Sequence, residues 1–362
     1  MFQTVISADS HVMEPTDLWL KTLSNRLGDR TPRLLEEYQG KKGRFFYTGG
    51  QVLIYGQGDA DAQKIGMQEA GWKPDVRVEF QKKAGVAVEI MNATMMLLIM
   101  RHPDREACEL SAQVFNDWLA DYVAYDRKRF LGVSMIPMFD VAWALKELER
   151  TVKKGLTCAN VHLVPPPGLP PYRKPYWDTF WARCEEMGVP VQLHIITGRI
   201  PDPLHYHTDE ERETSPSTLI ALGSEVMPVL ADDFIYGGIL DRFPKLKMLC
   251  TEFEISWIPY FMWRLDQMQQ AMAARLPLRK LKMRASDYMR QRIWHGMIDD
   301  KYGAEAIPHI GASQVLWGSD FPHIRSIGLD TQSALARMLA KLPPADQEKV
   351  VSGNAKQLFN IA

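Results

Sequence analysis

The sequence has few of the features that mark specialised classes of protein. Only 4 of its 362 residues are cysteines, and they are scattered without a CxxC pair. We therefore expect reduced, mostly buried thiols in a cytoplasmic protein. No run of 18 or more apolar residues occurs, so no membrane-spanning helix is expected. The N-terminal stretch MFQTVISADS has no basic region, long apolar stretch or small-residue cleavage site, and we predict no signal peptide.

An excess of charge of one sign is also missing. Lysine and arginine together number 43, aspartate and glutamate 44, and the formal net charge is -1. A basic surface that attracts nucleic acid or an anionic membrane is therefore not expected, and the predicted partner is a small-molecule substrate. No internal repeat, low-complexity tract or Ser/Gly linker divides the chain, so we predict a single domain over residues 1–362.

What the chain does contain is a recurring alternation of short apolar runs and helical stretches. Between the runs, apolar residues recur at every third and fourth position, as in 105–126, 141–155, 175–188 and 255–274, which is the period of an amphipathic helix. Eight strands that alternate with helices predict parallel βα units, and eight such units close into a (β/α)₈ TIM barrel. The 19 Met and 10 Trp residues are attributed to core packing rather than to an apolar pocket. The eight predicted strands are 4–9, 86–93, 130–138, 158–165, 189–195, 246–253, 292–298 and 314–321.

Residues 16–85 do not fit a simple βα unit and are predicted to form an insertion, or cap, after the first strand. Within them, 43–56 predicts a β-hairpin, because two apolar strands flank Gly49–Gly50, a pair that tolerates the positive φ of a tight turn. We expect this hairpin region to lie over the mouth of the barrel. The long polar stretch 197–218 is predicted to be a lid or binding loop.

Titratable side chains gather where the predicted strands end, and a barrel of this kind has its active site at those ends. Side chains on a strand alternate, so Asp9 and His11 share a face. Together with His194 and Asp320 they offer two imidazoles and two carboxylates, a set that suits Zn²⁺ or Mn²⁺. The full set is Asp9, His11, His162, His194, Glu252, Glu254, His295, Asp320 and His323.

Several stretches resemble the amidohydrolase superfamily, and within it the branch that includes the aminocarboxymuconate semialdehyde decarboxylase-like proteins. The similarity covers nearly the whole chain in the expected order. It is carried by ADSHVMEPTDLW (8–19), FNDWLADYVAYDRKRFLGVSMIPMFD (115–140), VQLHIITG (191–198), VLWGSDFPH (315–323) and SGNAKQLF (352–359).

The resemblance implies one divalent metal ion held by Asp9, His11, His194 and Asp320. Many members of the family have histidine where this chain has Asp9, and relatives with a carboxylate there still bind metal. Zinc is the expected ion, with manganese or iron as alternatives. The larger departure is Glu252, which stands where decarboxylating relatives carry a histidine. Three roles remain open for Glu252: a hydrogen-bond acceptor for a metal ligand, a ligand to a second metal, or a general base.

Other residues have both a functional and a structural interpretation. Glu14 forms a salt bridge near the rim or, less favoured, binds the metal, and Glu254 is interpreted as the start of the following helix. His162 is either a satisfied interior histidine or a substrate-binding residue, and His323 is assigned to substrate binding. His295 is a candidate proton donor. Arg325 is assigned to substrate binding as a carboxylate clamp, with Arg77 and Arg101 as further candidates, while His205 and His207 are expected to be solvated loop residues.

The leading hypothesis is a metal-dependent hydrolase acting on a small carbonyl-bearing substrate, aromatic or apolar in character. The metal would activate a water, and Asp320 would take its proton and pass it to the leaving group.

The alternative hypothesis is a metal-dependent, non-oxidative decarboxylase of an aromatic or unsaturated acid, with His295 or protonated Glu252 as proton donor. A barrel that binds a ligand without turnover is a third possibility, against which the metal set argues. The apolar stretch 258–265 serves either the core or a homodimer contact.

Overall fold

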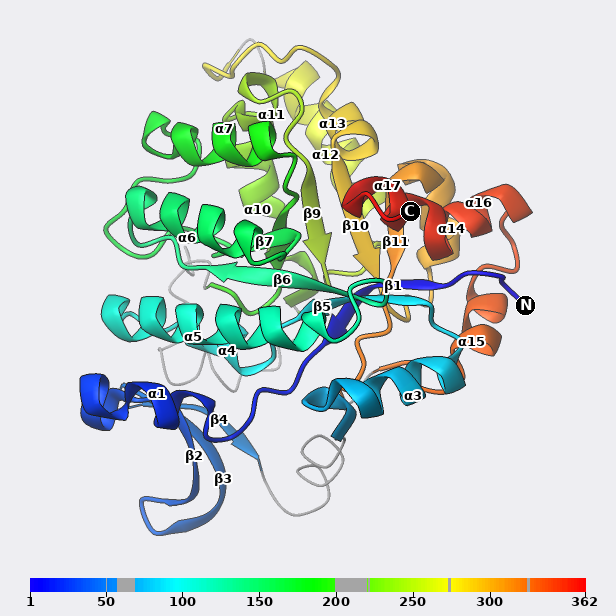
Figure 1. The fold of residues 1–362 in the computed structure, drawn as a ribbon. Helices are drawn as coiled ribbons and strands as arrows, with labels where there is room; N and C mark the ends of the chain where they lie inside the picture. The colour runs from blue at the N-terminus through cyan, green and yellow to red at the C-terminus, as the bar shows by residue number, and fades with distance from the viewer. Residues whose placement is uncertain (50, 57–68, 199–219, 221, 273–274, 324–325) are drawn as a thin grey trace. The chain divides into compact units, whose positions relative to one another are not determined.

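A computed structural model of the protein describes residues 1–49, 51–56, 69–198, 220, 222–272, 275–323 and 326–362. Among these residues, eight strands belong to one sheet, in the order in which they occur along the chain (Figure 1). The strands are β1 (Ile6–His11), β5 (Val88–Asn92), β6 (Phe130–Ile136), β7 (Cys158–Val161), β8 (Val191–His194), β9 (Met248–Thr251), β10 (Ile293–Met297) and β11 (Val315–Trp317).

The strand order is that of a (β/α)₈ TIM barrel. Neighbouring strands pair in parallel, for example Ile6 with Val88 and His194 with Thr251, and helices occupy the connections between strands. Strands such as β1 and β5 are buried at every residue, as expected of parallel strands covered on both faces. All eight predicted strands are confirmed to within a few residues.

The described chain divides into two compact units, which we describe separately. The first unit comprises Met1–Asn160 and Trp317–Arg337, and the second comprises Val161–Leu316 and Met338–Ala362. The prediction of a single domain over residues 1–362 stays a prediction.

In the first unit, β5 pairs with β1 on one side and β6 on the other, and α5 packs against β6 and α1 (Figure 1). The side chain of Asp104 accepts a hydrogen bond from the Ala107 amide, which caps the first turn of α5. The helices are α1 (Leu18–Leu27), α3 (Pro74–Ala84), α4 (Met95–Ile99), α5 (Arg105–Ala124), α6 (Val141–Lys153) and α15 (Thr331–Met338), whose last residue belongs to the second unit.

The segment between β1 and α3 contains a separate antiparallel sheet of three strands, β2 (Arg33–Tyr38), β3 (Lys41–Thr48) and β4 (Gln51–Gly56). Strands β3 and β4 pair from Thr48–Gln51 outward, within the range 43–56 predicted as a hairpin. Strand β2 adds a third member that sequence reading missed, because its residues are only partly buried and show no clear apolar alternation.

In the second unit, β9 pairs in parallel with β8 and with β10. Its aromatic core contains Tyr172, Trp177, Trp181 and Phe234, whose rings meet edge to face or tilted. The helices are α7 (Asp178–Met187), α10 (Met227–Val229), α11 (Ile239–Arg242), α12 (Ile258–Ala271), α13 (Ala285–Gln291), α14 (Gly303–Ile310), α16 (Pro344–Glu348) and α17 (Asn354–Phe359), with π-helical turns at Leu230–Ile235 and Lys349–Gly353.

The burial of sulfur-containing and aromatic side chains agrees with the sequence. All four cysteines are buried, and the tryptophans at 19, 177, 181 and 317 are fully buried. Core packing therefore explains these four tryptophans. Within the described ranges, none of the helices combines the length and apolar character needed to cross a membrane.

Candidate metal centre

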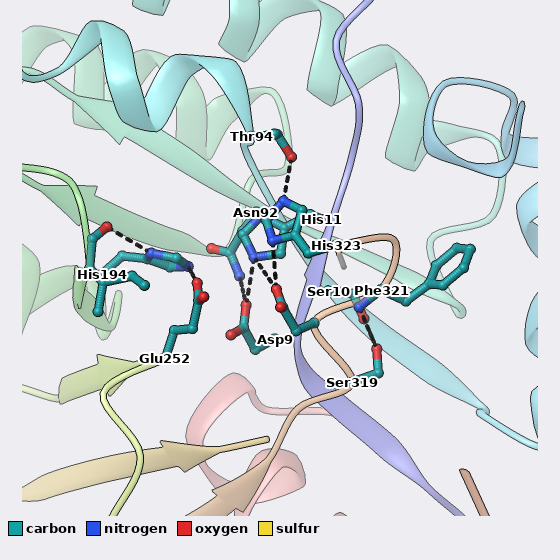
Figure 2. A network of polar contacts seen from close by, with 12 residues as sticks. Asp9, Ser10, His11, Asn92, Thr94, His194, Glu252, Ser319, Phe321 and His323 are labelled. Atoms are coloured by element: carbon teal, nitrogen blue, oxygen red, sulfur yellow. Dashed lines mark hydrogen bonds and ion pairs between the residues drawn. The ribbon is translucent and has the colours of Figure 1, made fainter. Parts of the chain in front are cut away.

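Three side chains of the first unit converge where β1 and β11 end. His11 is fully buried, and its Nε2 lies 3.2 Å from Asp9 Oδ1 (Figure 2). The same nitrogen lies 3.3 Å from Asp320 Oδ1. Asp9 and His11 are brought together by period-two alternation along β1, as predicted. Asp320 approaches from the segment that follows β11, which completes a group of one imidazole and two carboxylates.

The hydrogen bonding of His11 determines which ring nitrogen faces the carboxylates as an acceptor. Its Nδ1 lies 2.5 Å from the carbonyl oxygen of Ala93, so Nδ1 carries the proton and donates it there. In the neutral ring, Nε2 then directs a lone pair toward Asp9 and Asp320. Nitrogen and carboxylate oxygens that face one another in this way require a cation between them.

A metal ion fits this requirement better than a proton on His11. Burial is the largest influence on the pKa of His11, the nearby charge of His323 acts in the same direction, and together they lower the pKa despite the two carboxylates. Ligand atoms bound to one tetrahedral ion lie roughly 3.4 Å apart, close to the observed 3.2 and 3.3 Å. The spacing of His11, Asp9 and Asp320 is therefore compatible with a divalent metal ion, and their role as its ligands stays a prediction.

The backbone fixes the two ligand-bearing segments to each other. The Asp320 amide donates to the Asp9 carbonyl at 2.9 Å, and the His11 amide donates to the Phe321 carbonyl at 2.8 Å. Gly318 makes this approach possible, since a Cβ there would lie 2.4 Å from Asp9 Cβ. The amide nitrogen of the Asn92 side chain also donates to Asp9 Oδ1 at 2.9 Å.

His323 holds Asp320 from the other side. Its Nδ1 lies 2.7 Å from Asp320 Oδ1. Its Nε2 lies 3.0 Å from Thr94 Oγ1 (Figure 2). The Thr94 hydroxyl donates its proton to the Val12 carbonyl, so it accepts from His323. Both ring nitrogens of His323 are therefore donors inside the protein, and the residue positions Asp320. Its role in substrate binding stays a prediction.

The charge of His323 agrees with this bonding. Burial alone would lower the pKa of His323, but the hydrogen bond and charge of Asp320, together with Asp9 and Glu14, outweigh burial and raise the pKa. The raised pKa is consistent with donation from both ring nitrogens.

The second unit presents a histidine and a carboxylate in a related arrangement. His194 Nδ1 lies 3.1 Å from the Ile195 carbonyl oxygen, and Nε2 lies 3.5 Å from Glu252 Oε2 (Figure 2). Glu252 has φ +67° and Ile196 φ +70°, a region that is costly for residues other than glycine and especially for a β-branched one. Strained backbone of this kind is concentrated at functional sites. A metal role for His194 stays a prediction.

Two further candidates, the acidic Glu14 and the basic Arg77, have structural roles. Glu14 is buried, and its carboxylate accepts hydrogen bonds from the backbone amides of Thr94, Met95 and Met96, so it caps the start of α4 instead of forming a rim salt bridge. Arg77 is completely buried in a salt bridge with Glu89, which excludes the predicted role as a substrate clamp.

The predicted proton donor His295 is also committed elsewhere. Its Nε2 lies 3.0 Å from the Met289 carbonyl of α13, and burial lowers its pKa to about 4. Strand alternation identified the two faces of β10 but not which face meets the helices. These contacts give His295 a structural role, and its part as a proton donor stays a prediction.

The remaining candidates have different outcomes. His162 follows β7 and is buried, with its carbonyl accepting from the Tyr172 hydroxyl, and its role in substrate binding stays a prediction. Glu254 does not begin a helix; its carboxylate accepts from the Ile298 amide after β10. Three predicted residues lie outside the described ranges: Arg325, His205 and His207.

Sequence reasoning missed Asn92 and Thr94, which contact Asp9 and His323. Both stand at or just after the end of β5, the strand that pairs with β1. Their position is a signal that could have found them, because uncharged polar side chains at strand ends face the same region as the ligands.

Comparison with known proteins places the fold and the site in a family. A family model described as amidohydrolase matches residues 11–361. A gamma-resorcylate decarboxylase from Polaromonas sp. (strain JS666 / ATCC BAA-500) is 28% identical over 301 residues, which cover 79% of this chain and 87% of that protein. A 2-amino-3-carboxymuconate-6-semialdehyde decarboxylase from Dictyostelium discoideum is 21% identical over 302 residues, covering 80% and 77%.

A solved structure has the same fold. It is that of a dihydroxybenzoic acid decarboxylase from Polaromonas sp. JS666 with bound manganese and the inhibitor 2-nitroresorcinol. The TM-score is 0.69, with 21% sequence identity, and the match covers 99% of this chain and 98% of that chain. From the family match over nearly its whole length, the chain belongs to the amidohydrolase family, in the branch of the aminocarboxymuconate semialdehyde decarboxylase-like proteins.

Proposed function

We propose that the protein is a metal-dependent carboxy-lyase that removes carbon dioxide from a hydroxylated aromatic acid. The observation that carries the proposal is the group formed by His11, Asp9 and Asp320, a cation site in a chain whose relatives reported above are decarboxylases. Decarboxylation thus takes precedence over the hydrolysis that sequence reasoning favoured.

The residues of the first unit supply the ligands and their orientation. Asp9, His11 and Asp320 would hold the ion, while Asn92 and His323 fix the two carboxylates. When bound, the ion supplies a positive charge that fixes the substrate carboxylate and a neighbouring oxygen. The mixed nitrogen and oxygen donors suit manganese as well as zinc. His194 is proposed as a further ligand on the family resemblance.

The proposed reaction needs one proton at carbon. The bond between the ring and the carboxyl carbon breaks, carbon dioxide leaves, and a proton takes its place on the ring carbon. Of the two donors predicted from sequence, His295 is held by Met289. We therefore propose protonated Glu252 as the donor, with its contact to His194 Nε2 keeping the carboxyl in place.

The proposal is tested with metal-free protein reloaded with Mn²⁺ or Zn²⁺ and a panel of hydroxybenzoates that includes 2,6-dihydroxybenzoate. We expect carbon dioxide release and, in D₂O, one deuterium at the vacated ring carbon. Glu252→Gln is expected to reduce the rate at least 100-fold while bound metal is retained. The control His309→Gln, at an exposed position, should behave like wild type. Carbon dioxide release unaffected by Glu252→Gln would exclude Glu252 as the donor.

Hydrolysis remains a second candidate because Glu252 replaces the histidine expected in decarboxylating relatives. In that case Asp320 would accept a proton from water. Turnover of esters, lactones or amides in H₂¹⁸O, with one ¹⁸O in the acid product and no carbon dioxide, would favour hydrolysis over decarboxylation.

A further inference from the structure

A buried arginine contacts both ligand-bearing segments of the first unit. Arg77 lies on α3 and is fully buried. Its Nη1 donates to the His11 carbonyl at 3.0 Å, and its Nη2 donates to the Phe321 carbonyl at 3.2 Å. One acceptor belongs to a proposed metal ligand and the other to the residue after Asp320. A single guanidinium thus joins the end of β1 to the segment that follows β11.

The position of Arg77 is also fixed by a bidentate ion pair. Its Nε and Nη2 donate to the two carboxylate oxygens of Glu89 at 2.8 and 2.7 Å. Gln81 Nε2 and the Ser10 hydroxyl also donate to this carboxylate. A buried ion pair is tolerated when good geometry and additional hydrogen bonds compensate for the loss of water. Here the guanidinium binds the carboxylate through two parallel hydrogen bonds, and Gln81 and Ser10 add two more.

Aromatic packing holds the same group from another direction. The Arg77 guanidinium lies over the Phe321 ring, 4.5 Å from its centroid. Phe80, also on α3, stacks on Phe321 with centroids 3.7 Å apart. Helix α3 therefore holds Phe321 by its carbonyl and by its ring, and the adjacent Asp320 is held through the backbone.

We propose that Arg77 is a positioning residue for the metal site, which sets the separation of Asp9 and His11 from Asp320 without touching the ion. This inference rests on the proposed metal-dependent function. Lysine cannot replace Arg77, because one ammonium group cannot reproduce a planar fork that binds a carboxylate and two carbonyls together. Loss of the fork should let the two segments separate and weaken metal binding.

The chain offers a matched control in Arg150. It also binds a buried carboxylate, that of Glu147, with two hydrogen bonds of 2.8 Å, and contacts Asp117. It joins α6 to α5, and none of its contacts with described residues reaches Asp9, His11 or Asp320. Arg150→Lys therefore perturbs a bidentate ion pair to a buried carboxylate, with a more exposed arginine, without disturbing the ligand-bearing segments.

The test compares Arg77→Lys, Arg150→Lys and wild type for Mn²⁺ dissociation constant, melting temperature and amide hydrogen exchange of the metal-free protein. We expect Arg77→Lys to bind Mn²⁺ at least tenfold more weakly and to exchange faster in residues 9–12 and 318–323. In Arg150→Lys, the Mn²⁺ dissociation constant and the exchange rates of residues 9–12 and 318–323 should remain within threefold of wild type. This should hold even if its melting temperature falls as much as that of Arg77→Lys. Gln81→Leu leaves Arg77 in place but removes a hydrogen bond to its partner Glu89. It should weaken Mn²⁺ binding and speed exchange to a smaller extent, and it replaces Arg77→Lys in the test if that variant does not fold.

The two measurements separate the possible failures. Unchanged exchange in residues 9–12 and 318–323 would overturn the role of Arg77 whether or not metal binds. Faster exchange with an unchanged Mn²⁺ dissociation constant would overturn its role in metal binding. Failure of wild type to bind Mn²⁺ or Zn²⁺, with exchange still faster in Arg77→Lys, would overturn the proposed function and its metal site while leaving Arg77 as a link between the segments.

Discussion

His11 illustrates how a single backbone contact gives a side chain its chemistry. The Ala93 carbonyl takes the proton of Nδ1, and Nε2 is left to face two carboxylates. His194 repeats the pattern with the Ile195 carbonyl and Glu252. In both, a backbone acceptor beside the ring selects the tautomer that a metal ligand needs.

The buried His295 should make the protein sensitive to acid. Its pKa is lowered to about 4 in the folded state, against about 6.5 in an unfolded chain. The unfolded state therefore binds more protons between these values, and the free energy of unfolding falls as pH decreases from about 6.5 toward 4. The expected loss is about 2–3 kcal/mol. His295→Gln keeps an N–H for Met289 but does not titrate.

Urea unfolding at pH 7, 5.5 and 4.5 measures this difference. His295→Gln should lose less stability than wild type across that range, while the exposed His309→Gln should follow wild type. Parallel curves for wild type and His295→Gln would show that His295 is not the group responsible.

At the residue scale, the sequence predicted which side chains meet better than it predicted their further partners. The grouping of Asp9, His11 and Asp320 could be found because these residues lie at or after strand ends and match family motifs, while their role as ligands stays a prediction. The contacts of His295 and His323 could not be predicted. His295 meets Met289 of the preceding helix, a packing contact that strand alternation does not reveal, and Thr94 is 229 positions from His323.

At the element scale, glycine at position 318 allows the segment that follows β11 to approach Asp9 of β1. A Cβ there would lie 2.4 Å from Asp9 Cβ and 3.0 Å from the Asp9 amide nitrogen. Gly318→Ala should therefore cost about 1–3 kcal/mol and displace Asp9, with at least tenfold weaker Mn²⁺ binding. At Gly328 a Cβ would meet no atom closer than 4.0 Å, so Gly328→Ala should preserve stability and Mn²⁺ binding. Chemical denaturation and Mn²⁺ titration of both variants distinguish the two positions.

Helix α4 depends on an acidic side chain that precedes it by 80 residues or more. Glu14→Ala removes the acceptor of three backbone amides, Thr94 to Met96, and should cost about 2–4 kcal/mol, since unsatisfied buried donors are expensive. Asp140→Ala removes the local cap of α6, which accepts one amide, and should cost about 1 kcal/mol. Equal losses in urea unfolding would contradict the capping role of Glu14.

Strands and helices could be predicted where the spacing of their apolar residues is regular. The eight strands of the sheet were found because each is a short buried apolar run between helices. Strand β2 and the π-helical turn at Leu230–Ile235 were not. The first is half exposed, and the second differs from an α-helix by one extra residue per turn, which apolar spacing does not reveal.

At the scale of the whole molecule, the first unit joins distant parts of the chain. Ser7 and Ser319, which are 312 positions apart, share a buried hydrogen bond, and the Phe2 amide donates to Gln332. The proposed metal ligands make the same connection, since Asp9 and His11 belong to one segment and Asp320 to the other. Closing so long a loop is costly in chain entropy, and an ion that binds only the folded form offsets part of that cost.

Metal removal should therefore lower stability as well as activity. An ion present at 100 times its dissociation constant stabilises the folded state by about 2.7 kcal/mol, which in a chain of this size corresponds to a few degrees in melting temperature. Calorimetry of wild type with Mn²⁺ and with a chelator should show this difference. His11→Ala should melt at the same temperature in both conditions, because it loses the nitrogen that faces both carboxylates. His309→Ala, at an exposed position, should keep the full difference. A metal-dependent shift that persists in His11→Ala would place the ion elsewhere in the molecule.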